Sequence, residues 1–130
     1  MSALLDTHAL VWWMAAPERL SQRAHDRIAD KNAPLFVSAA SVYEIEYKRE
    51  RDELLYRLPR DLPQIVPMEG FSWLSIDAAD ALEAAELSNQ HRDPWDRIIA
   101  AQARRRDFDL ITADELLTHA CLGWRASTFW

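Results

Sequence analysis

The chain has 130 residues, 49% of them hydrophobic, which is enough for a buried core, and we expect a single domain over residues 1–130. The formal net charge of −6 argues against a general nucleic-acid-coating surface, although carboxylates that bind cations also count as negative and do not exclude an enzyme acting on nucleic acid. The chain has only two glycines and one cysteine, which excludes glycine-rich phosphate loops and an intramolecular disulfide. It has no long apolar run and no signal-peptide pattern, so we expect a cytoplasmic protein that lacks a membrane segment.

Short apolar runs alternate with helical patterns in the first half of the chain. We expect strands over residues 2–6 and 34–38, and helices over residues 7–15, 21–30 and 39–51. Ser21 is placed to cap the second of these helices, and Val42, Ile45 and Arg49 share one stripe of the third. Three prolines interrupt residues 54–67, which predicts loops with at most a short helix.

The second half continues the alternation. We expect strands over residues 71–76 and 108–112 and helices over residues 77–88, 94–105 and 113–120, with a final edge strand within residues 123–130. Asp77 suits the cap of one helix, and Pro94 suits the first turn of the next. Alternating strands and helices predict an α/β fold: a three-layer α/β/α arrangement around a central parallel sheet of four to five strands, where ligands bind beyond the carboxyl ends.

Four carboxylates stand where a strand or a loop turns into a helix. They are Asp6, Glu44, Asp96 and Asp114, and Asp93 is a fifth, one residue before Pro94. Each also has an ordinary structural explanation. Asp6 suits an N-cap, Ser41 and Glu44 match a capping box, and Thr112 or Asp114 suits the cap of the last long helix. For any one of these acids alone, capping or a solvated surface is the better interpretation.

The joint pattern favours a different interpretation, because parallel strands bring these helix starts to one edge of the sheet. Several carboxylates in one cleft raise one another's pKa values and destabilise the fold unless a cation neutralises them. Mg²⁺ and Mn²⁺ prefer oxygen ligands, and the sequence offers no histidine–cysteine cluster for zinc. Carboxylates that hold such an ion suit phosphodiester hydrolysis by a metal-activated water.

Four segments carry a family resemblance: LLDTHALVWW, SAASVYEIEYK, HRDPWDRIIAAQA and LITADELL. In this order and spacing, the chain resembles PIN-domain ribonucleases, and most closely the VapC-type toxins of bacterial toxin–antitoxin pairs. The resemblance spans nearly the whole chain. It departs at residues 51–54, where RDEL replaces a glycine-containing turn, and at residues 87–91, where LSNQH replaces an apolar, proline-containing stretch.

The resemblance implies a PIN-like fold and Mg²⁺- or Mn²⁺-dependent cleavage of RNA by a protein that forms a homodimer and is blocked by a cognate antitoxin. It implies that Asp6 and Asp96 are the principal metal ligands and that Asp114 binds the metal directly or through water. Glu44 would complete the pocket and orient the hydrolytic water. Asp93 would either cap its helix or add to the pocket.

Other residues have weaker assignments. Thr7, Ser41 and Thr112 lie beside the acids in sequence and either support them or cap helices. A position near the cleft is open to His8 and His91, but a structural or surface role is the better interpretation of each. We expect the arginines at 104–106 to be solvated and Cys121 to have no catalytic role. Trp73, Trp95 and Trp124 are expected in the core, together with at least one of Trp12 and Trp13.

Two further functions stay open. Asp6 at the end of a strand permits a phosphatase with an aspartate nucleophile, although His8 stands where such enzymes have a second aspartate. The chain is also compatible with a non-catalytic PIN-like binding module, against which the presence of all four acids argues.

Overall fold

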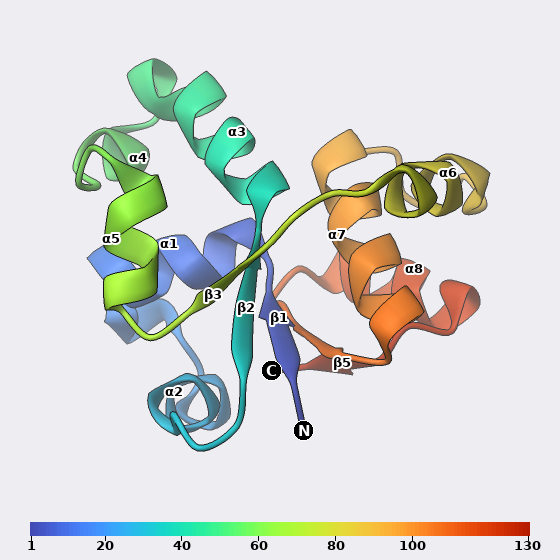
Figure 1. Ribbon diagram of the computed structural model, residues 1–130, viewed down its shortest axis with the longest axis horizontal. Helices are drawn as coiled ribbons and strands as arrows, with labels where there is room; N and C mark the ends of the chain where they lie inside the picture. Colours follow the sequence, from blue (N-terminus) through green and yellow to red (C-terminus); the bar gives the residue numbers. More distant parts are fainter.

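The structure, a computed structural model, describes residues 1–130 and contains a five-stranded sheet between two groups of helices (Figure 1). The strands are β1 (Ala3–Leu5), β2 (Leu35–Ser38), β3 (Ser72–Leu74), β4 (Asp109–Ile111) and β5 (Thr128–Phe129). The α-helices are α1 (Thr7–Ala15), α2 (Gln22–Ala29), α3 (Ala39–Lys48), α4 (Glu53–Tyr56), α5 (Leu62–Met68), α6 (Ala78–Glu86), α7 (Pro94–Arg106) and α8 (Glu115–Trp124). Two short 3₁₀ helices, η1 (Pro17–Arg19) and η2 (Arg49–Arg51), follow α1 and α3.

The sheet has the order β3-β2-β1-β4-β5, and every pair of neighbouring strands is parallel. At its centre, Leu4 of β1 lies opposite Phe36 of β2 and Leu110 of β4. This confirms the predicted parallel sheet, and the C-terminal segment supplies the expected edge strand. From β1 the chain builds outward first through β2 and β3 and later through β4 and β5, so the direction of winding reverses beside β1.

Successive side chains of the central strand enter opposite cores, as the period of two along a strand requires. Ala3 and Leu5 belong to a core shared with α1, α2 and α5, whereas Leu4 belongs to a core shared with α7 and α8. Figure 1 shows α1, α2, α4 and α5 on one side of the sheet and α6, α7 and α8 on the other. The predicted three layers are therefore confirmed. None of the helices combines the length and apolar character needed to cross a membrane.

The segment over residues 54–67 contains more helix than predicted, because the prolines stand at tolerated places and Arg49 organises the chain around it. Pro63 lies in the first turn of α5, and Pro67 lies next to its end. The side chain of Arg49 is 2% exposed and donates hydrogen bonds to the carbonyls of Leu55 (2.9 Å), Leu58 (2.8 Å) and Pro59 (3.1 Å). The prediction of loops with at most one short helix was wrong, since both α4 and α5 form here.

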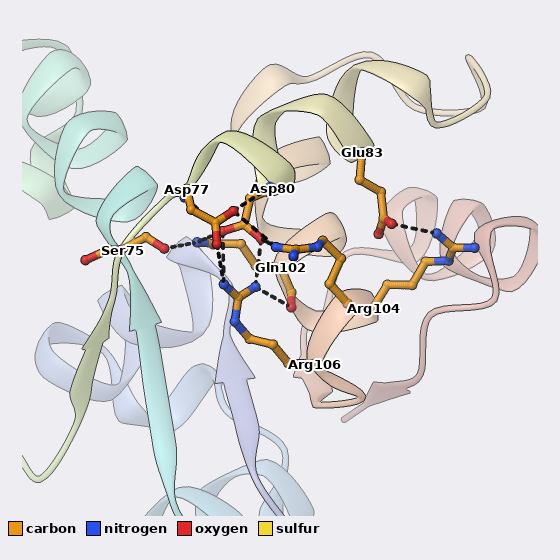
Figure 2. Close-up of polar contacts among 8 residues, drawn as sticks. Ser75, Asp77, Asp80, Glu83, Gln102, Arg104 and Arg106 are labelled. Atoms are coloured by element: carbon orange, nitrogen blue, oxygen red, sulfur yellow. Dashed lines mark hydrogen bonds and ion pairs between the residues drawn. The ribbon is translucent and has the colours of Figure 1, made fainter.

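A buried ion network joins α6 to α7 (Figure 2). Asp80 is fully buried, and its Oδ1 accepts hydrogen bonds from Arg105 Nη1 (2.5 Å) and Arg106 Nη1 (2.8 Å). Burial acts to raise the pKa of Asp80, but the bonds from Arg106, the Asp77 N–H and Arg105 outweigh it and hold that pKa well below its usual range. The arginines at 104–106 keep part of their side chains in solvent, as expected, but the pairing of Arg105 and Arg106 with Asp80 was not predicted.

The tryptophans divide between the core and its margin. Trp124 is buried and donates from Nε1 to the Ser88 hydroxyl at 3.0 Å, as a core tryptophan with a polar partner should. Trp73 and Trp95 are half-buried, so their placement in the core was wrong. Trp12 and Trp13 are also half-buried and pack against the core from α1.

Candidate functional site

The acids gather beyond the carboxyl ends of the two central strands. Asp6 directly follows β1, and Asp114 lies three residues after the end of neighbouring β4. The winding of the sheet reverses at this pair of strands, and ligands of open parallel sheets bind at such a reversal. The helices α3 and α7, which carry Glu44 and Asp96, contact each other at the same end of the sheet. The topology thus brings together four residues that are distant in sequence.

Asp6 and Asp114 both cap a helix and belong to the acidic cluster. Oδ1 of Asp6 accepts from the Ala9 N–H at 2.8 Å, and Oδ1 of Asp114 accepts from the Leu117 N–H at 3.0 Å. Each aspartate is the N-cap of its helix, as the capping interpretation predicts. A capping bond therefore orients each carboxylate, and a hydrogen bond with the Thr112 side chain also acts on Asp6 and lowers its pKa.

Asp93 and Asp96, at the start of α7, make different contacts. Asp93 is the N-cap, and its Oδ1 accepts from the Asp96 N–H at 3.0 Å. The Asp96 side chain is 18% exposed, and its Oδ2 lies 2.8 Å from Nε2 of His91. The structure therefore supports the capping interpretation of Asp93 and directs Asp96 into the pocket.

Glu44 is buried inside α3 rather than at its start. Ser38, not Ser41, caps this helix, so the predicted Ser41–Glu44 capping box was wrong. Oε2 of Glu44 accepts from Lys48 Nζ at 2.7 Å, one helical turn later. Oε1 of Glu44 is buried without a hydrogen-bond partner. Such an orphaned carboxylate oxygen is costly to leave unsatisfied, which indicates that this site has a ligand still to bind.

The residues around these acids hold them in place. Ser41 is buried, and its hydroxyl lies 3.0 Å from that of Thr7, which ties α3 to α1. Thr112 is also buried, and its Oγ1 accepts from the Asp114 N–H at 3.1 Å. Of the three, Thr112 contacts the acids themselves, and a functional role for Thr7, Ser41 and Thr112 stays a prediction.

The acids perturb one another's titration. Burial raises the pKa of Asp96 to about 6, aided by the charges of Asp93, Asp6 and Glu44 and opposed by the bond to His91. Burial also raises the pKa of Asp6, a shift that its hydrogen bonds offset only in part. Carboxylates that ionise reluctantly in one pocket mark a functional site, because a bound cation is what would stabilise their charged forms.

The donors in the pocket fit a divalent cation. Single ligand atoms of His91, Asp96 and Asp114 all lie within 4.8 Å of one another, and Asp6 and Glu44 act on Asp96 through their charges. A set dominated by carboxylate oxygens suits Mg²⁺ or Mn²⁺. Cys121 does not compete as a ligand or nucleophile, because burial raises the pKa of its thiol to about 12.

The contacts of three residues at this site were not predicted from the sequence. His91, near the acids in sequence and expected to be structural or at the surface, is half-buried and contacts Asp96. Lys48 had a readable signal, since a lysine four residues after Glu44 predicts an ion pair on a helix. Arg97 donates to the carbonyls of Ala84 (2.8 Å) and of His91 (2.8 Å), a role for which the sequence holds no short-range signal.

The comparisons with known proteins agree with this geometry. The family model of the PIN domain matches residues 3–121. The chain is 33% identical over 119 residues to Ribonuclease VapC22 of Mycobacterium tuberculosis, a match that covers 89% of each chain. Among solved structures, VapBC2 from Rickettsia felis bound to a DNA fragment from its promoter matches with a TM-score of 0.72 at 13% identity, over 99% of this chain and 98% of that one. FitAcB from Neisseria gonorrhoeae matches with a TM-score of 0.70 at 20% identity, over 100% and 97%. These two structures bear on the fold, whereas the family model and the curated relative establish kinship. The chain therefore belongs to the PIN-domain family, with the VapC-type ribonucleases.

Proposed function

We propose that the protein is a Mg²⁺- or Mn²⁺-dependent endoribonuclease and the toxin of a toxin–antitoxin pair. The observation that carries this proposal is the cluster of Asp6, Glu44, Asp96 and Asp114, in which the pKa of Asp96 is raised and one oxygen of Glu44 is buried without a hydrogen-bond partner. Kinship with Ribonuclease VapC22 supports RNA as the substrate class.

In this proposal the acids divide the work. Asp6, Asp96 and Asp114 hold the divalent ion, which when bound lowers the pKa of water and stabilises charge on the phosphate oxygens. Oε1 of Glu44, free of any protein partner, accepts a hydrogen bond from the attacking water and orients it. Lys48 holds Oε2 of the same carboxylate and thereby fixes the direction of Oε1.

A cavity of about 240 Å³ beside the acids offers space for part of the substrate. It lies between α1, α3 and α4, and its lining includes Glu44 and the lysine paired with it, Lys48. Arg19 and Lys48 supply cationic donors suited to phosphate, and Trp12 supplies an aromatic face suited to a base. We therefore propose that RNA adjoining the scissile bond enters here.

Partners follow from the relatives rather than from the site. VapBC-5 from Mycobacterium tuberculosis, which matches with a TM-score of 0.55 at 18% identity, is described as a member of the VapBC family of toxin–antitoxin systems, which supports a cognate antitoxin for this chain. The homodimer, the cytoplasmic location and the single domain over residues 1–130 stay predictions of the sequence.

Removing divalent cations tests the proposed reaction. The purified protein is expected to cut single-stranded RNA with Mg²⁺ or Mn²⁺ present, to stop when a chelator is added, and to resume when the ion is returned in excess. The measurement is the rate at which a labelled oligoribonucleotide is cleaved. Cleavage that continues at the same rate in chelator would refute the proposal, and trapping a phosphorylated Asp6 would favour the aspartate phosphatase instead.

The affinity for Mn²⁺ is expected to depend on pH through Asp96. Because its pKa in the fold is raised to about 6, a proton must leave before the carboxylate can bind metal. Titration of Asp96 alone then weakens binding about tenfold between about pH 7.5 and about pH 5. Calorimetric titration across this range measures the effect and the protons released. Equal affinities at the two ends would show that Asp96 is not a ligand.

A further inference from the structure

His91 occupies a built position at the edge of the acidic pocket. It lies in the loop between α6 and α7, and its side chain is only 12% exposed. Arg97 holds the loop by donating from Nη1 to the carbonyls of Ser88 (3.0 Å) and His91 (2.8 Å). Trp124 holds it at a second point by donating to Ser88. The backbone of the loop is therefore fixed by other residues, and the imidazole of His91 is not needed to hold it.

The imidazole instead faces the carboxylates. Nε2 of His91 lies 2.8 Å from Oδ2 of Asp96. A ring nitrogen of His91 also lies within 4.8 Å of a carboxylate oxygen of Asp114. Three atoms at such separations surround a point that lies within bonding distance of all of them after small side-chain rotations, because metal–ligand bonds are about 2.1 Å long.

We infer that His91 is a direct ligand of the divalent ion, completing with Asp96 and Asp114 a site that has one nitrogen donor among its oxygens. The inference rests on the proposed function only in that the pocket binds a divalent ion at all. A second feature points to a ligand in the same pocket, since Oε1 of Glu44 is buried without a partner. The contact between His91 and Asp96 in the metal-free chain then gives way to two bonds to the ion.

A nitrogen donor sets the preference among metals. Imidazole binds transition metals well, whereas Mg²⁺ gains little over a water molecule in its place. The site is therefore expected to bind Mn²⁺ more tightly than Mg²⁺, and the difference is expected to depend on His91. Without His91 all the ligands in the pocket are oxygen atoms, and the affinities for Mn²⁺ and Mg²⁺ are expected to differ less.

Pulsed electron paramagnetic resonance on the Mn²⁺-loaded full chain tests the inference independently of activity. Spin-echo modulation from a directly bound imidazole nitrogen is expected in the wild type. It is expected to vanish in His91→Asn and to persist in His119→Asn, a matched change at an exposed histidine of α8. Calorimetry is expected to show roughly tenfold or greater loss of Mn²⁺ affinity in His91→Asn, and a smaller loss for Mg²⁺. The wild-type spectrum reports nitrogen ligation by itself, and the variants identify the histidine that supplies it.

Different results would contradict the ligand role of His91 and the proposed metal-dependent function. Mn²⁺ bound in the wild type without nitrogen modulation would overturn the role of His91 and leave the carboxylate site standing. Modulation that survives in His91→Asn and disappears in His8→Asn would overturn it in favour of His8. A wild type that binds no Mn²⁺ would overturn this inference and the proposed function together.

Discussion

The Asp96→Asn variant is expected to lose RNA cleavage by about 10²–10³-fold or more, because it removes a carboxylate at the centre of the pocket. The same change is expected to stabilise the metal-free protein by about 1 kcal/mol at neutral pH. The sign follows from the pKa of Asp96, which burial and the neighbouring acids raise to about 6 in the fold. A carboxyl whose pKa is higher in the folded than in the unfolded chain opposes folding once it is ionised, and this cost grows as the pH rises through the range from about 4 to about 6. An amide carries no such cost.

The matched control for this variant is Asp107→Asn on the same helix. Asp107 is exposed at the other end of α7 and has a left-handed backbone with φ of 57°, which asparagine also adopts readily. We would measure the RNA cleavage rate and the denaturant unfolding of both variants and of the wild type. The comparison distinguishes the loss of a carboxylate in the pocket from the loss of a negative charge elsewhere on α7. If Asp96→Asn cleaves RNA normally, or if it loses activity only because it unfolds, the assignment of Asp96 is wrong.

The Asp80→Asn variant is expected to destabilise the fold by about 1.5–3 kcal/mol, because a neutral amide replaces the buried carboxylate that accepts hydrogen bonds from two arginines. Asp80 is fully buried, and Arg105 and Arg106 converge on it from α7. The effect on stability can be measured by urea denaturation. A loss below about 1 kcal/mol would mean that the network contributes no more than a surface ion pair.

Asp77→Asn is the control in the same network. Asp77 is 55% exposed and caps α6, a task that asparagine performs about as well. Its substitution is expected to change stability by less than about 1 kcal/mol.

The effects of the two substitutions on stability are also expected to depend differently on pH. The pKa of Asp80 is lowered in the fold, so its contribution is fully present above its unfolded pKa of about 3.9 and disappears as the pH falls toward the folded value. The gap between wild type and Asp80→Asn is therefore expected to narrow below about pH 4.

The central fold and the main acids could be predicted because they depend on local signals. Short apolar runs such as residues 2–6 and 34–38 predict buried strands, and parallel strands joined by helices bring their carboxyl ends to one edge. This property of parallel sheets is enough to predict that Asp6 and Asp114 lie close together. Their second use as helix caps was also predictable, and the structure shows that the two interpretations hold at once.

What the sequence could not predict depends on contacts between distant segments. Arg105 and Arg106 looked solvated because Asp80, their partner, lies 25 and 26 residues away in another helix. His91 looked structural because only the anchoring of its loop by Arg97 and Trp124 turns it toward Asp96. Residues 54–67 looked like loop because the carbonyl contacts of Arg49, which organise the segment, leave no periodic pattern in the sequence.

The most direct test of the central claim is the location of the metal. Crystals of the protein soaked with Mn²⁺, measured for anomalous scattering, are expected to show a peak about 2.1 Å from carboxylate oxygens of Asp96 and of at least one of Asp6 and Asp114. The peak is expected to disappear in crystals of Asp96→Asn. A Mn²⁺ peak elsewhere, or no peak in this pocket at an ion concentration that supports RNA cleavage, would contradict the account.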